Sequence, residues 1–178
     1  MASIESVIHT KSYEHLVRVV RRHGITFTIY VLIFLAMICI PPIAYYLFEA
    51  AFANALQGSA SMPILILAGS AYYLSLALFF YSFFVEFYLD CWILTNDRLI
   101  DIRQISLFAR TVAEVDLYQI QDVSSEVKGF FSSVFNYGNV YLQTAGPVPK
   151  FILLNVPNPD GLRQQILDLA SEDKKFHT

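Results

Sequence analysis

The chain has 178 residues, of which 56% are hydrophobic and 15% aromatic, and its formal net charge is −3. This length accommodates an apolar hairpin and one compact domain with a small core. Residues 90–178 carry eight basic and eleven acidic side chains, a balance that disfavours nucleic-acid binding because phosphates must be neutralised by clustered Lys and Arg.

The segment ahead of the first apolar run predicts a short amphipathic helix over residues 12–23, with Ser12 as its cap. Apolar side chains recur at helical spacing on one face: Tyr13, Leu16, Val17 and Val20. Arg18, Arg21 and Arg22 lie on the other face. We expect this helix to rest in the lipid headgroup layer with its arginines near phosphates, or alternatively to pack on the protein's own domain.

Two long apolar runs, residues 24–48 and 62–87, dominate the first half of the chain. Glu49 is the one formally charged residue between Gly24 and Val85. As a helix, each run would reach roughly 35–38 Å at about 1.5 Å per residue, enough for a bilayer core about 30 Å thick. The sequence therefore predicts a transmembrane hairpin over residues 24–89, the alternative being a buried hairpin in a soluble protein.

The distribution of basic residues predicts the orientation of this hairpin. The connection 49–61 contains no Lys or Arg, whereas basic residues precede the first run and follow the second: Lys11, Arg18, Arg21, Arg22, Arg98 and Arg103. Basic residues near the ends of spans mark the cytoplasmic side. We therefore expect a multi-pass protein of the inner (cytoplasmic) membrane with both termini in the cytoplasm.

Small residues form a stripe along one face of the second run. They are Ala68, Ala71, Ser75 and Ser82. Such stripes let helix backbones approach closely in lipid. We expect this stripe to make the helix–helix contact with the first run, and a contact with another copy or another protein is the alternative.

Beyond the hairpin the hydrophobic pattern changes to a period of two. Trp92 is expected at the inner membrane interface, where aromatic side chains gather. Alternating or apolar stretches then follow at residues 99–104, 113–117, 122–127, 139–144 and 151–156. This pattern predicts short antiparallel strands that form a small sandwich or a partly open barrel.

A terminal helix is predicted from the sequence Asn158-Pro159-Asp160, which combines an N-cap, a first-turn proline and an acidic first turn. Apolar residues follow at Leu162, Ile166 and Leu169, the spacing of one helix face. We expect this helix to close one end of the sheet, and residues 172–178 to form a polar tail.

Three short motifs in the second half appear in a characteristic order. They are WILTNDRLI at residues 92–100, LYQIQDV at 117–123 and FNYGNV at 135–140. The chain in this region resembles the bacterial pleckstrin-homology-like family, also called the membrane-flanked domain family. The positions that carry the fold motifs are Thr95, Asn96, Arg98, Tyr137 and Gly138.

The resemblance implies an α+β membrane protein in which a two-helix hairpin precedes a cytoplasmic, strongly bent seven-stranded PH-like domain over residues 90–171. It implies a hairpin turn at Asn96-Asp97 and, at Gly138, a backbone conformation that other residues resist. Asn136 departs from the family pattern, which often has glycine there, and we expect this to change only the local turn.

The sequence offers no convincing constellation for catalysis. His9, His15 and His23 lack metal-ligand spacing, and Lys128 is flanked by serines typical of turns. We therefore expect no enzyme activity, no metal and no cofactor. Recognition of a phosphoinositide headgroup is also disfavoured, because the basic residues of this acidic domain are spread out.

These observations together predict a non-enzymatic, membrane-anchored interaction module. The expected role is that of an accessory or stabilising subunit in a larger membrane protein complex, in contact with membrane lipids and other subunits. The alternatives are a homo-oligomeric membrane scaffold and a sensor of anionic lipids.

Overall fold

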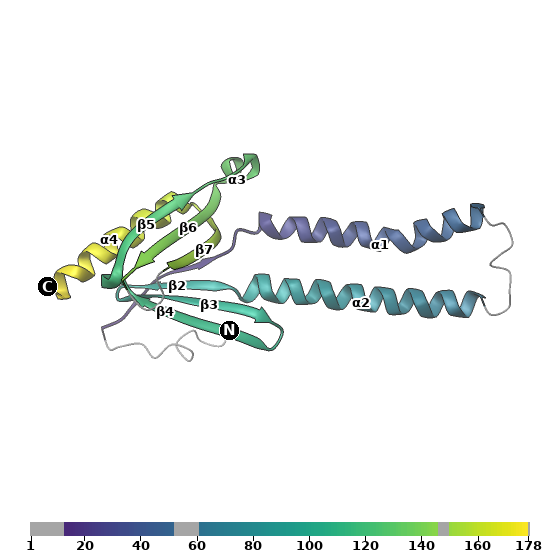
Figure 1. The fold of residues 1–178 in the computed structure, drawn as a ribbon, viewed down its shortest axis with the longest axis horizontal. Helices are drawn as coiled ribbons and strands as arrows, with labels where there is room; N and C mark the ends of the chain where they lie inside the picture. Colours follow the sequence, from purple (N-terminus) through teal and green to yellow (C-terminus); the bar gives the residue numbers. More distant parts are fainter. Residues whose placement is uncertain (1–12, 52–60, 146–149, 178) are drawn as a thin grey trace. The chain divides into compact units, whose positions relative to one another are not determined.

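The structure is a computed structural model that describes residues 13–51, 61–145 and 150–177, and the chain divides into two compact units (Figure 1). Gly24–Val85 form the hairpin unit. The chain up to His23 and the chain from Glu86 onward form the folded unit. A segment that precedes the hairpin in the sequence therefore belongs to the same folded unit as the segment that follows it.

The hairpin unit contains two helices, α1 (Ile25–Ala51) and α2 (Ser61–Leu89). The end of α2, from Glu86 onward, belongs to the folded unit. The two helices coincide with the two predicted apolar runs. Both helices are long and apolar enough to cross a membrane, and none of the residues in their most apolar stretches is buried. The helical prediction is therefore confirmed for both runs.

Four antiparallel strands form the first sheet, in the order β1-β2-β3-β4. Their bounds are β1 Leu16–Arg21, β2 Cys91–Thr95, β3 Arg98–Ser106 and β4 Ala109–Asp116. The turns between β2, β3 and β4 are short, so these three strands form a meander. β1 precedes the hairpin in the sequence, and it pairs with β2, which follows the hairpin.

The prediction of a helix over residues 12–23 is wrong, because Leu16–Arg21 form β1. Val20 pairs with Trp92, and Arg21 pairs with Cys91, across the β1–β2 ladder. The valines of this segment are β-branched and favour an extended backbone, and an isolated helix of this length is marginal in water. Pairing with β2 therefore decides the conformation.

Three further antiparallel strands form the second sheet, in the order β5-β6-β7. Their bounds are β5 Ile120–Glu126, β6 Tyr137–Thr144 and β7 Lys150–Pro157. A 3-10 turn, η2 (Leu117–Gln119), precedes β5, and a short helix, α3 (Phe130–Val134), joins β5 to β6. The described strands thus number seven, as the resemblance implied, divided between two sheets.

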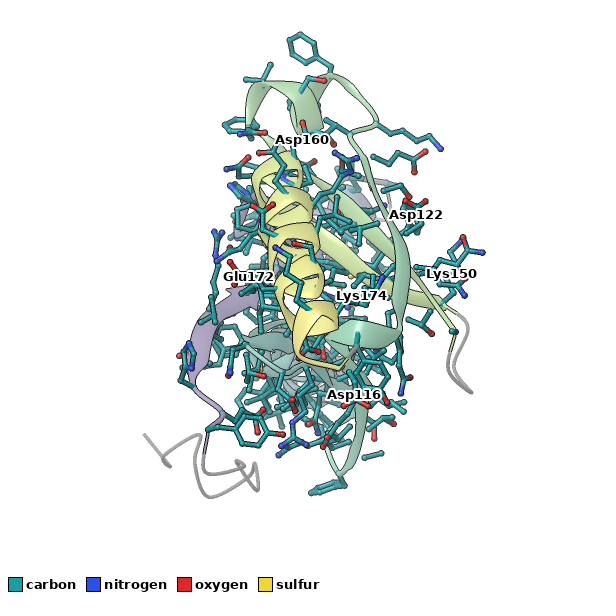
Figure 2. All side chains as sticks on the ribbon, turned by 90° about the vertical axis from the view of Figure 1, so that its left-hand side faces the viewer. Asp116, Asp122, Lys150, Asp160, Glu172 and Lys174 are labelled. Carbon is teal, nitrogen blue, oxygen red and sulfur yellow. The ribbon has the colours of Figure 1, made fainter. Side chains whose placement is uncertain are left out.

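The terminal helix α4 (Pro159–His177) lies over the strands of the second sheet, from Asp160 near one end to Lys174 near the other (Figures 1 and 2). The Asn158 side-chain oxygen accepts a hydrogen bond from the Gly161 N–H (3.2 Å), which confirms the predicted N-cap. The predicted polar tail over 172–178 is wrong, since α4 continues to His177. Its last turns are held because Asp173 accepts from the Tyr118 N–H (3.1 Å).

The core of the folded unit lies where the two sheets and α4 meet. Its fully buried side chains come from every one of these elements: Leu94, Leu99, Leu117, Val123, Leu142, Leu153 and Ile166. Burial of these apolar side chains is the main stabilising contribution, at about 25 cal/mol per Å² removed from water. The core fixes the strand ends and turns that are described next.

Candidate functional site

The predicted motif residues Thr95 and Asn96 form the turn between β2 and β3. The Thr95 hydroxyl oxygen accepts from the backbone N–H groups of Asp97 (3.3 Å) and Arg98 (3.0 Å), which closes the turn. The Asn96 side chain accepts from the His15 N–H (2.7 Å). The motif therefore shapes its own hairpin and also holds the chain just ahead of β1.

Arg98 forms a two-pronged ion pair with Glu14. Its Nε donates to one carboxylate oxygen (2.8 Å) and its Nη2 to the other (2.6 Å), while Nη1 pairs with Glu114 (2.6 Å). The Glu14 side chain is completely buried. Hydrogen bonding to Glu14 raises the pKa of Arg98 further, so the guanidinium stays charged at every physiological pH.

Tyr137 and Gly138 are the first two residues of β6. They lie close in space to His23, the residue at which the chain leaves the folded unit toward α1. The His23 ring stacks on the Tyr137 ring, with centroids 5.4 Å apart. A Cβ on Gly138 would clash with the backbone carbonyl of Glu126 on β5, and the φ angle of Gly138 is not positive. The positive φ (50°) belongs to Asn136, a residue type that tolerates it. Gly138 is therefore required for close strand approach rather than for an unusual conformation.

Replacing Gly138 with alanine is expected to lower the free energy of unfolding by about 1–3 kcal/mol, the usual cost of overpacking, because β5 and β6 must separate to admit the methyl group. Ser124→Ala on β5 is the matched control, since this side chain is exposed. Chemical denaturation followed by Trp92 fluorescence measures both. Equal stability of the two variants would contradict the close approach.

The three arginines expected at lipid headgroups contact side chains of the folded unit. Arg18 donates to Gln165 (3.2 Å), Arg21 lies over the Tyr88 ring (5.2 Å) and Arg22 pairs with the buried Asp90 (2.6 Å). Asp90 also accepts from the Gln104 N–H (2.7 Å). These contacts attach β1 to α4, to the end of α2 and to β3, so their role within the fold is structural.

The prediction that Trp92 lies at the membrane interface is wrong, because its side chain is in the core and only 2% exposed. Trp92 is on β2, between β1 and β3, and it pairs with Val20 and Asp101. A side chain on the inner face of a central strand points into the core whatever its affinity for interfaces. The tryptophan at this position therefore marks the core of the folded unit and not the membrane interface.

Asp101 is a carboxylate on the same buried side of the first sheet. Burial raises its pKa, and Arg103, which donates to it (2.9 Å), opposes this effect. Among the described residues, the other carboxylate oxygen has no well-formed hydrogen bond. Asp101 thus carries a desolvation cost whenever it is ionised.

Replacing Asp101 with asparagine is expected to remove part of the pH dependence of stability. A carboxyl whose pKa is raised on folding binds its proton more tightly in the folded state, so its contribution is present below the unfolded pKa of about 3.9 and is lost as the pH rises through the folded pKa. The free energy of unfolding of the variant should therefore rise relative to that of the wild type as the pH increases from acidic to neutral. Denaturation curves over that range test this; a constant difference would contradict it.

Burial also raises the pKa of the Cys91 thiol at the start of β2, which lowers its reactivity at neutral pH. Cys39 lies within α1 and is likewise a free thiol. Among the described residues, no group of three or more His, Cys, Asp or Glu side chains is arranged to hold a metal ion.

Aromatic rings make much of the contact between α1 and α2. Phe34 stacks on Phe80 with centroids 4.2 Å apart, and Tyr30 stacks on Phe83 at 5.5 Å. Of the small-residue stripe, Ala71 and Ser75 are exposed, and the helix–helix contact expected for the stripe stays a prediction.

The serines of this stripe bond within their own helix. Ser75 donates to the Ala71 carbonyl (2.8 Å) and Ser82 to the Leu78 carbonyl (2.9 Å). Ala68 lines a pocket between the two helices. A contact of the stripe with another copy or another protein stays a prediction.

Two tyrosines of α2 donate hydrogen bonds to backbone carbonyls of α1 that two prolines leave without helical donors. Pro41–Pro42 have no N–H, so the carbonyls four residues earlier, those of Met37 and Ile38, lose their helical donors. The Tyr72 hydroxyl donates to the Met37 carbonyl (2.9 Å), and the Tyr73 hydroxyl donates to the Ile38 carbonyl (3.1 Å). We call these two hydrogen bonds the tyrosine clasp.

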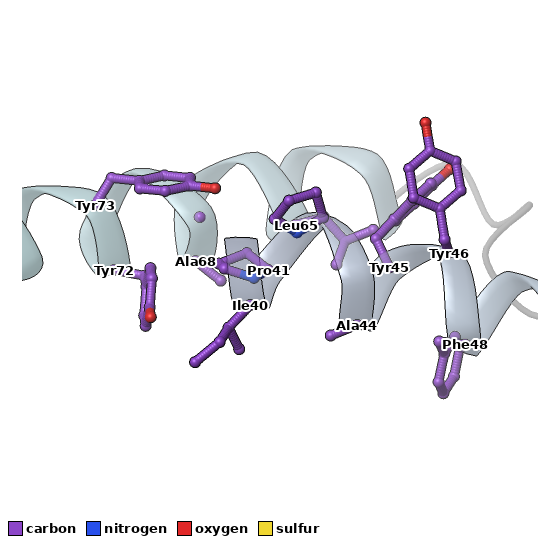
Figure 3. Close-up of a pocket in the computed structure, with 12 residues that line it drawn as sticks. Ile40, Pro41, Ala44, Tyr45, Tyr46, Phe48, Leu65, Ala68, Tyr72 and Tyr73 are labelled. Atoms are coloured by element: carbon purple, nitrogen blue, oxygen red, sulfur yellow. The ribbon is translucent and has the colours of Figure 1, made fainter. Parts of the chain in front are cut away.

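The clasp borders an apolar pocket of about 880 Å³ between α1 and α2. Figure 3 shows Tyr72 and Tyr73 toward one end of this pocket, Pro41 and Ala68 near its middle, and Phe48 toward the other end. None of the described residues that line the pocket is charged, and apart from tyrosine hydroxyls their side chains are apolar.

The edges of the two sheets differ in how they are covered. On β5, Arg163 of α4 donates to the Val123 carbonyl (2.9 Å), and Lys174 donates to the Ile120 carbonyl (2.7 Å). β1 and β7 are linked by the His23 N–H, which donates to the Asn155 carbonyl (2.7 Å). β4 is the last strand of its sheet, and its residues 109–112 are exposed. We call this the β4 edge.

Both hairpin helices and the two sheets fall within one family match. A family model described as a bacterial PH domain matches residues 15–170. The chain belongs to the bacterial PH domain family. This confirms the resemblance carried by the motifs at residues 92–100, 117–123 and 135–140.

A solved structure gives a weaker likeness. It is a DUF1696-family protein with a pleckstrin-homology domain from Shewanella loihica, 19% identical, with a TM-score of 0.38, covering 46% of this chain and 70% of that one. A search of curated proteins found no match.

Family membership changes the predicted start of the PH-like domain. The match begins at residue 15, and β1 pairs with β2. In this bacterial PH domain protein the apolar hairpin is therefore inserted between the first and second strands of the sheet, whereas residues 90–171 were predicted to form the domain alone.

Sequence reasoning missed Glu14 and the tyrosine clasp. Glu14 lies 84 positions from Arg98, and nothing in the sequence links the two. The clasp did leave a readable signal. The adjacent prolines Pro41 and Pro42 leave two adjacent carbonyls of α1 without helical donors. The adjacent tyrosines Tyr72 and Tyr73 lie on α2, the other helix of the hairpin.

Proposed function

We propose that this protein is a non-enzymatic, membrane-anchored interaction module and serves as an accessory or stabilising subunit of a larger membrane complex. In this proposal α1 and α2 span the inner membrane, both termini are cytoplasmic, and the PH-like domain works at the cytoplasmic surface. Its partners are membrane lipids and other membrane protein subunits.

The tyrosine clasp supports the membrane-spanning part of the proposal. In hydrocarbon no water can hydrogen-bond a free carbonyl, so each must find a donor in the protein. The Met37 and Ile38 carbonyls have one each, on a hairpin whose apolar side chains are otherwise exposed. Basic residues flank the two helices on the same side, as expected for cytoplasmic ends.

The observation that carries the interaction role is the β4 edge. An uncovered edge strand offers a row of backbone donors and acceptors to an extended segment of another protein. β5 is covered by Arg163 and Lys174 of α4, and β1 is linked to β7, while residues 109–112 of β4 are exposed. Strand addition at β4 would give a partner main-chain hydrogen bonds without any catalytic group.

Native mass spectrometry of the protein extracted gently from its own membrane tests this proposal. We expect a complex of fixed composition that contains a second protein. Val112→Lys should release that protein, because a charge on an edge strand blocks strand addition, whereas Gln143→Lys, at an exposed position on the central strand β6, should not. A lone chain under all conditions would overturn the accessory role, and a homo-oligomer would favour the scaffold.

A further inference from the structure

Two exposed aromatic tips stand out on the folded unit. The first, the β3–β4 tip, carries Ile105 (61% exposed) and Phe108 (98% exposed). The second, the α3 tip, carries exposed apolar side chains on and just after α3: Phe130, Phe131, Val134 and Phe135. Among the phenylalanines of this unit whose exposure the structure describes, Phe151 is buried, Phe87 is half-buried and the exposed ones all lie on these two tips.

The β3–β4 tip lies at the end of the folded unit where α2 leads into β2. β2 and β3 are antiparallel, and Cys91, the first residue of β2, pairs with Ile102. The Gln104 N–H reaches the Asp90 carboxylate (2.7 Å). β3 continues past this point to Ser106, so Phe108 lies beyond the start of β2, at the same end of the sheet as Asp90.

The α3 tip lies at the same end, beside the other connection to the hairpin. α3 leads into Tyr137, whose ring stacks on His23, the last residue of the folded unit before α1. The His23 N–H donates to the Asn155 carbonyl of β7 (2.7 Å). Figure 1 shows α3 and the β3–β4 turn both away from the C-terminal end of α4.

We propose that both tips insert their aromatic side chains into the interfacial layer of the bilayer that the hairpin spans. This inference rests on the proposed membrane anchoring. If α1 and α2 span a bilayer, the two connections at His23 and Glu86 lie at its surface, and both tips belong to the end of the folded unit that carries these connections. Exposed phenylalanines bury their rings among acyl chains at the headgroup boundary.

Basic residues beside the tips fit this occupant. Arg110 follows the β3–β4 tip and is exposed. Lys128 precedes the α3 tip and is 80% exposed, although its ammonium group pairs with Glu126 (2.6 Å). Apolar tips flanked by Lys or Arg are suited to an anionic cytoplasmic leaflet, which attracts the charges while the rings enter the lipid. Two separated contacts, together with the two chain connections, would fix how the domain is oriented on the membrane and hence where the β4 edge points.

Tryptophan quenching in the full chain, reconstituted into vesicles that contain anionic lipid, tests the inference. Phe108→Trp and Phe131→Trp each place a reporter on one tip. Tyr118→Trp places it on η2, at the opposite end, where the Tyr118 N–H bonds to Asp173 of α4 (3.1 Å). Phe79→Trp places it on the exposed face of α2. The native Trp92, buried in the core, supplies a constant background.

Lipids brominated near the headgroup end of the acyl chains should quench the added fluorescence of Phe108→Trp and Phe131→Trp and leave that of Tyr118→Trp unchanged. Lipids brominated deeper should quench Phe79→Trp most. Quenching of Phe79→Trp without quenching at either tip would overturn this inference alone and indicate a protein partner for the tips. Absence of quenching at Phe79→Trp would overturn the membrane anchoring itself.

Discussion

Replacing Arg98 with alanine is expected to lower the free energy of unfolding of the folded unit by about 3–5 kcal/mol, the usual cost of breaking a buried ion pair. The Glu14 carboxylate is fully buried and receives two hydrogen bonds from Arg98, at 2.8 and 2.6 Å. Without them Glu14 keeps a desolvated charge. The chain ahead of β1 would then lose its strongest attachment to the β2–β3 turn.

Lys128→Ala is the control for this prediction. Lys128 also pairs with a carboxylate, that of Glu126 (2.6 Å), but its side chain is 80% exposed, so its loss should leave the free energy of unfolding almost unchanged. Trp92 is the single tryptophan and lies in the core, which makes its fluorescence a direct report of unfolding.

A paired replacement separates the ion pair from other effects of residue 98. Glu14→Leu combined with Arg98→Leu removes both buried charges, and we expect it to recover most of the lost stability, because apolar groups of similar size can replace a buried pair. Equal losses in Arg98→Ala and Lys128→Ala, or no recovery in the double variant, would contradict this account.

The regular elements were predictable because each has a local signature. The stretches 99–104, 113–117, 122–127, 139–144 and 151–156 alternate or are apolar, and each falls largely within one of the strands from β3 to β7. The two apolar runs became α1 and α2, and Asn158 capped α4. Periodicity and capping act over a few residues and are therefore visible in the chain itself.

β1 was not predictable from its own residues. The segment LVRVVR places apolar side chains at both helical and alternating spacing, so its pattern fits either element. The choice depends on β2, which lies on the far side of the hairpin and offers an edge to pair with. Trp92 was misplaced for the same reason, since its burial depends on β1 and β3 on either side of it.

The candidate sites were partly predictable. The turn residues Thr95 and Asn96 were identified by motif, and their hydrogen bonds explain the motif. The unusual backbone conformation expected at Gly138 lies instead at Asn136, and Gly138 serves close strand approach. The sequence did not distinguish the two reasons for a glycine, because a positive φ and a close approach favour the same residue type. The aromatic tips escaped notice because exposure is a property of the folded surface.

Removing both hydroxyls of the tyrosine clasp is expected to destabilise the pairing of α1 with α2. The double replacement Tyr72→Phe and Tyr73→Phe keeps both aromatic rings and removes only their hydroxyl groups. The Met37 and Ile38 carbonyls then lose their hydrogen-bond donors. An unsatisfied carbonyl shielded from water costs about 1–3 kcal/mol, so the pair of changes approaches the cost of losing Arg98. Tyr81→Phe, an exposed position on the same helix, is the control and should have no effect.

The prolines make this prediction unusually specific. Pro41→Ala combined with Pro42→Ala restores the two backbone N–H groups that a helix supplies to the Met37 and Ile38 carbonyls. In that background the two Tyr→Phe changes should cost little. Helix dissociation by rising SDS, followed by energy transfer between dyes placed on each helix, measures all four combinations. A cost that is the same with and without the prolines would mean that the tyrosines act by packing, whereas a cost that disappears identifies the clasp as the replacement for the missing helical hydrogen bonds.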